Sequence, residues 1–114
     1  PYSTFGVVNS RNTLIGAAVF NDWHPGGNLA WSYAGPGSLT RGVLRALAQY
    51  VFVQLGAARL TCKTKRGNVV ARRLLPKAGF EFEGTQKRYY GPERKDDALS
   101  FVLFRENAQR WLDL

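Results

Sequence analysis

The sequence predicts one α/β domain over residues 1–114, built on a mixed, mostly antiparallel twisted sheet with two main helices. The first 34 residues contain β-rich runs separated by turns, and a second group of β-rich runs lies between residues 59 and 104. Between them, a long helical pattern connects two strands, which makes the pairing of those two strands parallel. A chain of 114 residues has the length of a single domain.

Three strands are expected at the N-terminal end, over residues 2–9, 13–21 and 29–34. Residues 10–12 (SRN) have the composition of a hairpin turn, and residues 22–28 (DWHPGGN) are rich in turn-forming residues. These three strands therefore form an antiparallel meander.

The chain is organised around the stretch from residue 35 to Gly56. Apolar residues recur at the three- and four-residue spacing of a buried helix face: Val43, Leu44, Leu47, Val51, Phe52 and Leu55. Ser38 or Thr40 can cap the start of this helix, and Gly56 suits the left-handed position after its end. A strand, a glycine-rich turn and a helix start together present free N–H groups, so this stretch predicts an anion site suited to phosphate.

The second half of the chain begins with a strand over residues 59–64, in which Leu60 and Cys62 share one face. A second helix follows, with Asn68 as its N-cap and Gly79 as its terminator. Pro76 lies inside this pattern and should kink the helix or end it early, because proline has no N–H to donate.

The remaining elements are two strands and a short helix. A strand is expected over residues 80–90, with a bulge at Gly84. A charged loop over residues 91–97 leads to an apolar strand over residues 98–104, and a terminal helix is expected over residues 107–114.

Composition narrows the class of function. The net charge of +8, from 16 basic and 8 acidic residues, favours polyanionic partners. The aromatic residues do not interleave with the basic ones as stacking platforms would, so nucleic acid is not expected as a partner. A single cysteine and a single histidine argue against a disulfide or a zinc site and favour a cytoplasmic location, and no apolar run is long enough to span a membrane.

The segment RGNVVARRLLPKAGFEFEG, residues 66–84, resembles the motif N-x-x-(A/S)-x-x-x-x-x-K-x-G-F-x-x-E-G of GNAT-superfamily N-acetyltransferases. The residues in register with the motif are Asn68, Ala71, Lys77, Gly79, Phe80, Glu83 and Gly84. Residues 40–56 also reproduce a helix pattern of one subgroup, TRxxLRAxxxYxFxQLG. The resemblance extends over nearly the whole chain and implies the GNAT-like acyl-CoA N-acyltransferase fold, with a splayed parallel strand pair.

The resemblance also implies acetyl-CoA as cosubstrate. Its pantetheine arm would lie between the splayed strands, and its pyrophosphate would lie on the amides at the helix start. The matching positions are Tyr33, Ala34, Gly37, Ser38, Leu39, Thr40, Arg41, Gly42, Asn68 and Arg72.

Three departures from the family pattern stand out. The loop reads GPGSLTRG, with hydroxyl residues where glycine is usual, although backbone donors survive that change. Leu75 replaces the tyrosine that protonates the departing thiolate in many members. The usual first strand and two helices are absent or nearly so, hence the acceptor groove should be open or completed by a second subunit, as in a homodimer.

Direct acetyl transfer to an amine requires a neutral nucleophile and a route for its proton. The candidate bases are Asp22, His24 and Glu83. The candidate acids in place of the family tyrosine are Ser32, Tyr33, Tyr89 and Tyr90, none of which is matched by the motif. Cys62 is expected to pack in the core and not to carry an acyl group.

Three hypotheses follow from these observations. The leading one is an acetyl-CoA-dependent N-acetyltransferase acting on an amine, with a protein lysine, a protein N-terminus and a small amine all open as acceptors. The second is a catalytically impaired protein of the same fold that binds and modulates a partner protein. The third, a nucleic-acid-binding domain, is supported by the charge alone.

Overall fold

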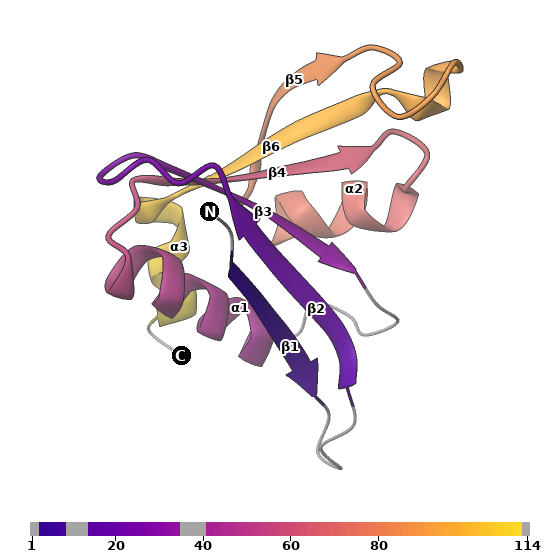
Figure 1. The fold of residues 1–114 in the computed structure, drawn as a ribbon. Helices are drawn as coiled ribbons and strands as arrows, with labels where there is room; N and C mark the ends of the chain where they lie inside the picture. The colour runs from indigo at the N-terminus through magenta and orange to yellow at the C-terminus, as the bar shows by residue number, and fades with distance from the viewer. Residues whose placement is uncertain (1–2, 9–13, 35–40, 113–114) are drawn as a thin grey trace.

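A computed structural model describes residues 3–8, 14–34 and 41–112, and side chains from residue 19 onward within those ranges, apart from residues 33 and 34. In these residues six strands form one sheet in the order β1-β2-β3-β4-β6-β5 (Figure 1). The strands are β1 (Ser3–Val8), β2 (Leu14–Asn21), β3 (Asn28–Ala34), β4 (Arg59–Lys65), β5 (Glu81–Gln86) and β6 (Ala98–Phe104). Among the strands that the structure describes, only β3 and β4 pair in parallel, which confirms the predicted mixed sheet.

The helical segments are α1 (Arg41–Ala48), the π-helix η1 (Gln49–Gln54), α2 (Val69–Lys77), the 3₁₀ turn η2 (Arg94–Asp96) and α3 (Arg105–Leu112). No helix within the described ranges is long and apolar enough to span a membrane.

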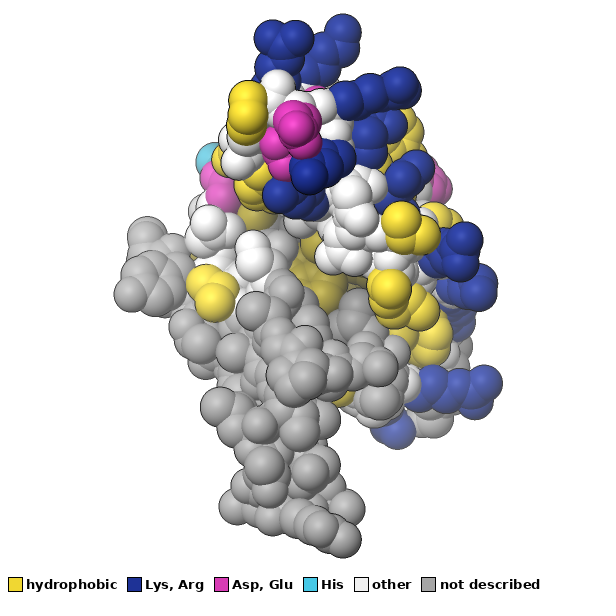
Figure 2. Space-filling model, turned by 90° about the vertical axis from the view of Figure 1, so that its right-hand side faces the viewer, with side chains coloured by type: hydrophobic (Ala, Val, Ile, Leu, Met, Phe, Trp, Pro, Cys, Tyr) yellow, Lys and Arg dark blue, Asp and Glu magenta, His cyan; other side chains and the backbone are white. Residues whose placement is uncertain are grey.

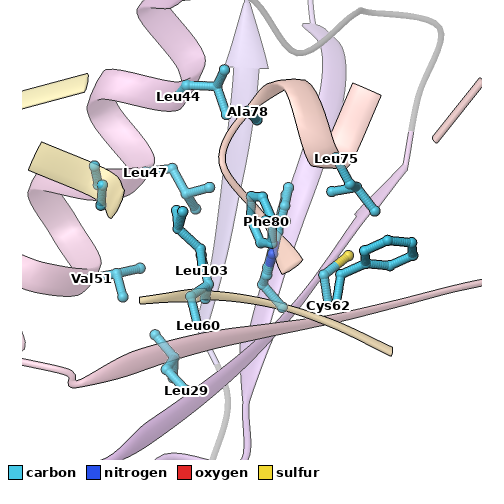
Figure 3. Packing of buried hydrophobic residues seen from close by; sticks show 14 of the residues in the cluster. Leu29, Leu44, Leu47, Val51, Leu60, Cys62, Leu75, Ala78, Phe80 and Leu103 are labelled. Atoms are coloured by element: carbon cyan, nitrogen blue, oxygen red, sulfur yellow. The ribbon is translucent and has the colours of Figure 1, made fainter. Parts of the chain in front are cut away.

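The three α-helices pack on the same face of the sheet. Leu29, Leu60 and Leu103 point from β3, β4 and β6 into one core, and strand residues two apart share a face. The helices close that core with their own apolar side chains: Leu44, Leu47 and Val51 from α1 and η1, Leu75 from α2 and Ala108 from α3 (Figure 3). The opposite face of the sheet carries the alternate residues and is covered by no described helix.

The long helix predicted between residue 35 and Gly56 is continuous over residues 41–54 of the described chain, and it changes from α to π geometry at Gln49. The buried residues recur at three- and four-residue spacing through both parts of the helix: Leu44, Leu47, Ala48, Val51 and Phe52. The same apolar face therefore stays on the core across the change in geometry. Gly56 has φ +67°, which confirms the predicted left-handed end.

The ends of α2 follow the sequence signals. The Asn68 side chain accepts a hydrogen bond from the N–H of Ala71 at 3.1 Å, and Gly79 has φ +100°. Pro76 does not end the helix early, since α2 continues to Lys77. A proline this close to the C-terminus removes one intrahelical bond and leaves the earlier turns intact.

The predicted strand over residues 80–90 is shorter in the structure. A register shift between Phe82 and Gly84 confirms the bulge, but β5 ends at Gln86. The chain turns at Arg88, which has φ +55° and donates its N–H to Asp97 Oδ1 at 2.8 Å.

The terminal helix also starts earlier than predicted, at Arg105 instead of residue 107. The Arg105 guanidinium donates to the carbonyls of Phe52, at 2.8 Å, and Ala57, at 3.3 Å. These contacts with the end of η1 fix the first turn of α3.

Candidate active site

The parallel strands β3 and β4 separate partway along their length. Their register runs from Asn28–Arg59 to Trp31–Cys62 and stops there. β3 continues alongside β2 to Ala34, and β4 continues alongside β6 to Lys65 (Figure 1). We call the separated ends of the two strands, residues 32–34 of β3 and 63–65 of β4, the arms, and the space between them the opening. The outer pairings thus hold each arm in place on either side of the opening.

The helices that follow the two arms begin near the opening. The predicted positions Tyr33 and Ala34 lie in the separated arm of β3, where only their backbone is described. Arg41 and Gly42 form the first turn of α1, and both are exposed. Gly37, Ser38, Leu39 and Thr40 lie outside the described residues.

A groove of about 170 Å³ runs between the start of α1 and the end of α2. It is lined by Arg41, Leu44, Leu74, Lys77, Ala78 and Trp111. Two of these residues are cationic, so the groove combines an apolar floor with positive charge.

Two further predicted cofactor residues lie at the start of α2. Asn68 uses its side-chain oxygen as the helix cap and is exposed. The Arg72 guanidinium donates to the carbonyl of Arg66 at 3.1 Å, so this side chain braces the turn between β4 and α2.

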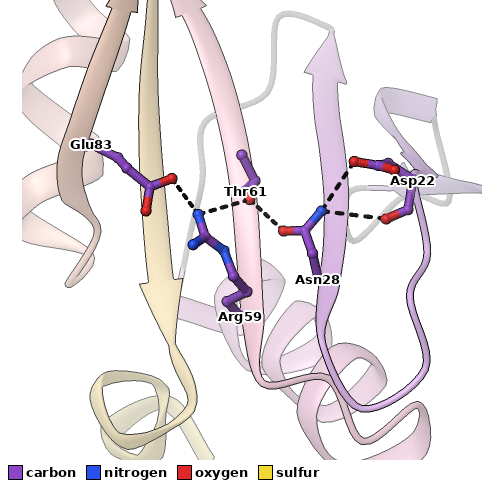
Figure 4. A network of polar contacts seen from close by, with 5 residues as sticks. All are labelled: Asp22, Asn28, Arg59, Thr61 and Glu83. Carbon is purple, nitrogen blue, oxygen red and sulfur yellow. Dashed lines mark hydrogen bonds and ion pairs between the residues drawn. The ribbon is translucent and has the colours of Figure 1, made fainter.

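Polar side chains on the helix-free face of the sheet form a connected network (Figure 4). Thr61 Oγ1 donates to Asn28 Oδ1 at 2.5 Å, and Arg59 lies 3.4 Å from Thr61 and forms an ion pair with Glu83. The Asn28 amide donates to the backbone and side chain of Asp22, at 3.3 and 3.4 Å. The network therefore links the β2–β3 loop to the β5 bulge across β3, β4 and β6.

The candidate bases occupy different places along this network. His24 and Asp22 form an exposed pair at 2.9 Å in the β2–β3 loop. They precede β3, and four paired residues of β3 separate them from the opening, which is about 13 Å along a strand.

Glu83, by contrast, lies level with the point where β3 and β4 part. In the row of paired residues at the end of the parallel register, Cys62 of β4 lies beside Phe101 of β6, which lies beside Phe82 of β5. In the next row, Lys63 lies beside Ser100, which lies beside Gly84. Glu83 is the extra residue of the bulge between these two rows, and its ion pair with Arg59 holds the carboxylate over the helix-free face.

Leu75 and Cys62 both belong to the core. Leu75 is buried, so the position of the family's tyrosine acid provides no hydroxyl in this chain (Figure 3). Burial raises the pKa of the Cys62 thiol to about 12, and the thiol is therefore protonated at neutral pH. A covalent acyl-cysteine route is not supported, as expected from the sequence.

Asn28, Arg59 and Thr61 are site residues that no motif in the sequence predicts. These side chains come from different strands, and only the parallel register brings Asn28 beside Arg59 and Thr61. The one available signal was the alternation of β4, which places Arg59 and Thr61 opposite Leu60 and Cys62.

Comparisons with known proteins agree with this geometry. The sequence profile of the family described as "Acetyltransferase (GNAT) domain" matches residues 1–81. A variant of the spermidine N-acetyltransferase SpeG from Vibrio cholerae superimposes with a TM-score of 0.81 at 16% identity, covering 94% of this chain and 68% of that one. A GCN5-related N-acetyltransferase from Brucella melitensis gives a TM-score of 0.78 at 24% identity, covering 96% of this chain and 54% of that one.

At these identities the structural likeness establishes the fold. A search of curated proteins by sequence found no significant match.

Proposed function

Because the chain belongs to the GNAT acetyltransferase domain family, we propose that it transfers an acetyl group directly from acetyl-CoA to an amine. The observation that carries the proposal is the separation of β3 and β4 after Trp31 and Cys62, while each keeps its other neighbour. An extended ligand that carries amide groups can lie between such arms and pair with them as a strand would.

The residues around the opening fit acetyl-CoA. The backbone of Tyr33 and Ala34 would pair with the pantetheine arm and polarise the thioester carbonyl. The amides of residues 37–42 would hold the pyrophosphate, since the first N–H groups of a helix such as α1 have no partner within the helix. Arg41 adds positive charge, and Asn68 borders the opening from the start of α2.

The acceptor amine would approach from the helix-free face, and we assign the general base to Glu83. Glu83 lies at the level of the opening, two strand spacings or about 10 Å from β4, and its carboxylate reaches back to Arg59 of β4. Asp22 and His24, by contrast, lie about 13 Å away along β3. Arg59 positions the carboxylate through their ion pair. A water molecule can then carry the proton from the amine to Glu83.

The acceptor class is an amine, with protein lysines and N-termini as the leading candidates. The alternative is a protein of this fold that binds a partner without catalysis, and it is favoured by one observation, the buried leucine at the position of the tyrosine acid. The single-domain organisation, the cytoplasmic location and completion of the groove by a second subunit stay predictions.

Thermal unfolding during a titration with acetyl-CoA tests the proposal. A ligand that binds only the folded state raises the melting temperature in a saturable way. We expect stabilisation by acetyl-CoA at micromolar concentration, a much weaker effect of ATP, and release of CoA thiol when amine peptides are added. Stabilisation without thiol release would support the binding protein, and no stabilisation by millimolar acetyl-CoA would refute the acetyltransferase and leave the binding protein.

A further inference from the structure

A basic hollow lies beside the end of β4, apart from the opening between β3 and β4. It has a volume of about 420 Å³ and is lined by Arg66, Lys87, Arg88, Pro92, Arg94 and Asp97. Figure 2 shows Lys and Arg side chains gathered at the top of this face of the molecule. We refer to this site as the basic hollow.

The positive charge of this region is not neutralised within the described chain. Residues 63–67 and 86–97 contain seven basic and three acidic residues. Each acidic one has a basic partner: Asp96 pairs with Lys65 at 3.0 Å, Asp97 with Arg66 at 3.2 Å, and Glu93 with Lys95 at 3.2 Å. In the described part of the chain, no ion pair joins Lys87, Arg88 or Arg94 to a carboxylate.

The loop that forms the hollow is held in shape by two buried carboxylates. Asp97 accepts the N–H of Arg88 at 2.8 Å, and Asp96 accepts the N–H of Glu93 at 3.0 Å through its side chain. The backbone carbonyl of Asp96 also accepts the N–H of Tyr90 at 2.9 Å. The guanidinium groups are thus presented from a preorganised loop, which reduces the entropy lost on binding.

The hollow is close to the proposed acetyl-transfer site. Arg66 directly follows Lys65, the last residue of the separated arm of β4. Arg66 follows Cys62, the level at which the arms part, by four positions, or about 13 Å along a strand. An extended peptide spans this distance in about four residues at most.

We propose that the basic hollow binds an acidic segment of the acceptor, a peptide that carries Asp or Glu within about four residues of the reacting amine. This inference rests on the proposed function and names its substrate class. Arginine forks bind carboxylates through paired hydrogen bonds, which suits a peptide rich in Asp and Glu. A polycationic acceptor such as a polyamine would be repelled by the same charges.

Nucleic acid fits the hollow less well. Its two neighbouring tyrosines are exposed, but Tyr89 contacts Tyr90 edge to face at 4.9 Å and has the Lys63 ammonium 4.8 Å from its ring centre. One ring face of Tyr89 is therefore occupied by the Lys63 ammonium, which leaves less of the ring for stacking of a base.

The test compares two peptide acceptors that differ only in the residues two to four positions from the amine, Asp and Glu in one and Ser and Gln in the other. Thiol release and peptide binding by fluorescence anisotropy are both measured at 0.15 M salt. We expect the KM and the dissociation constant of the acidic peptide to be about tenfold lower than those of the Ser and Gln peptide. This factor corresponds to two charge-assisted hydrogen bonds that water partly screens. Arg88→Gln and Arg94→Gln should each reduce this preference, and their KM for acetyl-CoA should not change.

Arg45→Gln is the matched control, because it removes an exposed guanidinium from α1, away from the hollow, and should keep the preference. The inference would be overturned if both peptides were used equally or if the preference survived in the two variants. Tighter binding of a short RNA than of the acidic peptide would overturn it as well. A raised KM for acetyl-CoA in the variants would assign the hollow to the cofactor's phosphates and also overturn it. Selective binding of the acidic peptide without thiol release would support the inference and count against the proposed function.

Discussion

Trp31 and Cys62 are the last residues at which β3 and β4 lie in register. Beyond them each strand follows a different neighbour, β2 for Ala34 and β6 for Lys65. A parallel pair that separates inside a sheet exposes backbone hydrogen-bonding groups that folding has not paired. An extended ligand with amide groups can satisfy these groups, which links the sheet geometry to cofactor binding.

The first prediction concerns the positive charge at the start of α1. We expect Arg41→Gln to weaken acetyl-CoA binding about fivefold, corresponding to an exposed ion pair worth ~1 kcal/mol. Arg45→Gln, one turn later on the same helix, should leave the affinity unchanged. Isothermal titration with acetyl-CoA measures both. Equal affinities in the two variants would place the pyrophosphate elsewhere.

The second prediction concerns the general base. Glu83→Gln should lower kcat about 100-fold or more, since general base catalysis contributes roughly 10²–10⁴-fold. The KM for acetyl-CoA should stay the same, because Glu83 lies on the face of the sheet opposite the helices. His24→Gln should change kcat less than about threefold. A large loss of activity in His24→Gln with little loss in Glu83→Gln would reverse the assignment.

Much of the fold follows from local patterns in the sequence. The alternation of residues 59–64 and the apolar spacing from Leu44 to Leu55 depend on one element at a time, and the structure confirms both. The parallel pairing was also predictable, because a single helix connects β3 to β4 and such a connection brings parallel strands together.

Features that depend on distant contacts were not predictable. Tyr89 and Tyr90 have β-forming side chains, yet β5 ends before them because Asp96 and Asp97 hold this segment in a turn. The position of Glu83 level with the opening depends on two successive strand registers and a bulge. The motif identified Glu83 as a family match, but its level in the sheet comes only from these registers.

The third prediction concerns Cys62. Burial raises the pKa of its thiol to about 12, so the reactive thiolate is scarce at pH 8 in the folded protein. Iodoacetamide should modify Cys62 in urea but not under native conditions, as measured by mass spectrometry. Cys62→Ser should keep the steady-state rate of thiol release, and neither protein should release a burst of thiol before the amine is added, because no acyl-cysteine forms. Rapid native labelling or loss of all activity would contradict this.

The fourth prediction concerns acid stability. The N–H of Arg88, and then Arg66, lower the pKa of Asp97, while the N–H of Glu93, and then Lys65, lower that of Asp96. Both carboxylates therefore stabilise the fold fully above the unfolded pKa of about 3.9, and this stabilisation is lost as the pH falls through the lower folded values.

Urea unfolding of the wild type and of Asp97→Asn tests this pH dependence. The variant should be less stable at pH 7, and the difference in unfolding free energy should shrink as the pH is lowered below about 4. A difference of the same size at pH 3 and pH 7 would show that the charge of Asp97 does not stabilise the loop.

The last prediction separates the shape of the basic hollow from its charge. A Cβ atom placed on Gly91 would lie 2.6 Å from Asp96 Oδ2, which is closer than real Cβ contacts allow. Gly91→Ala should therefore displace the Asp96 carboxylate from the N–H of Glu93 and from Lys65, lower the melting temperature by several degrees, and weaken binding of the acidic peptide without removing a positive charge. Gly84→Ala is the matched control, because a Cβ there meets no atom within 4 Å. If Gly91→Ala binds the acidic peptide as well as Gly84→Ala does, the hollow acts through its net charge alone and the preorganised loop is unnecessary for recognition.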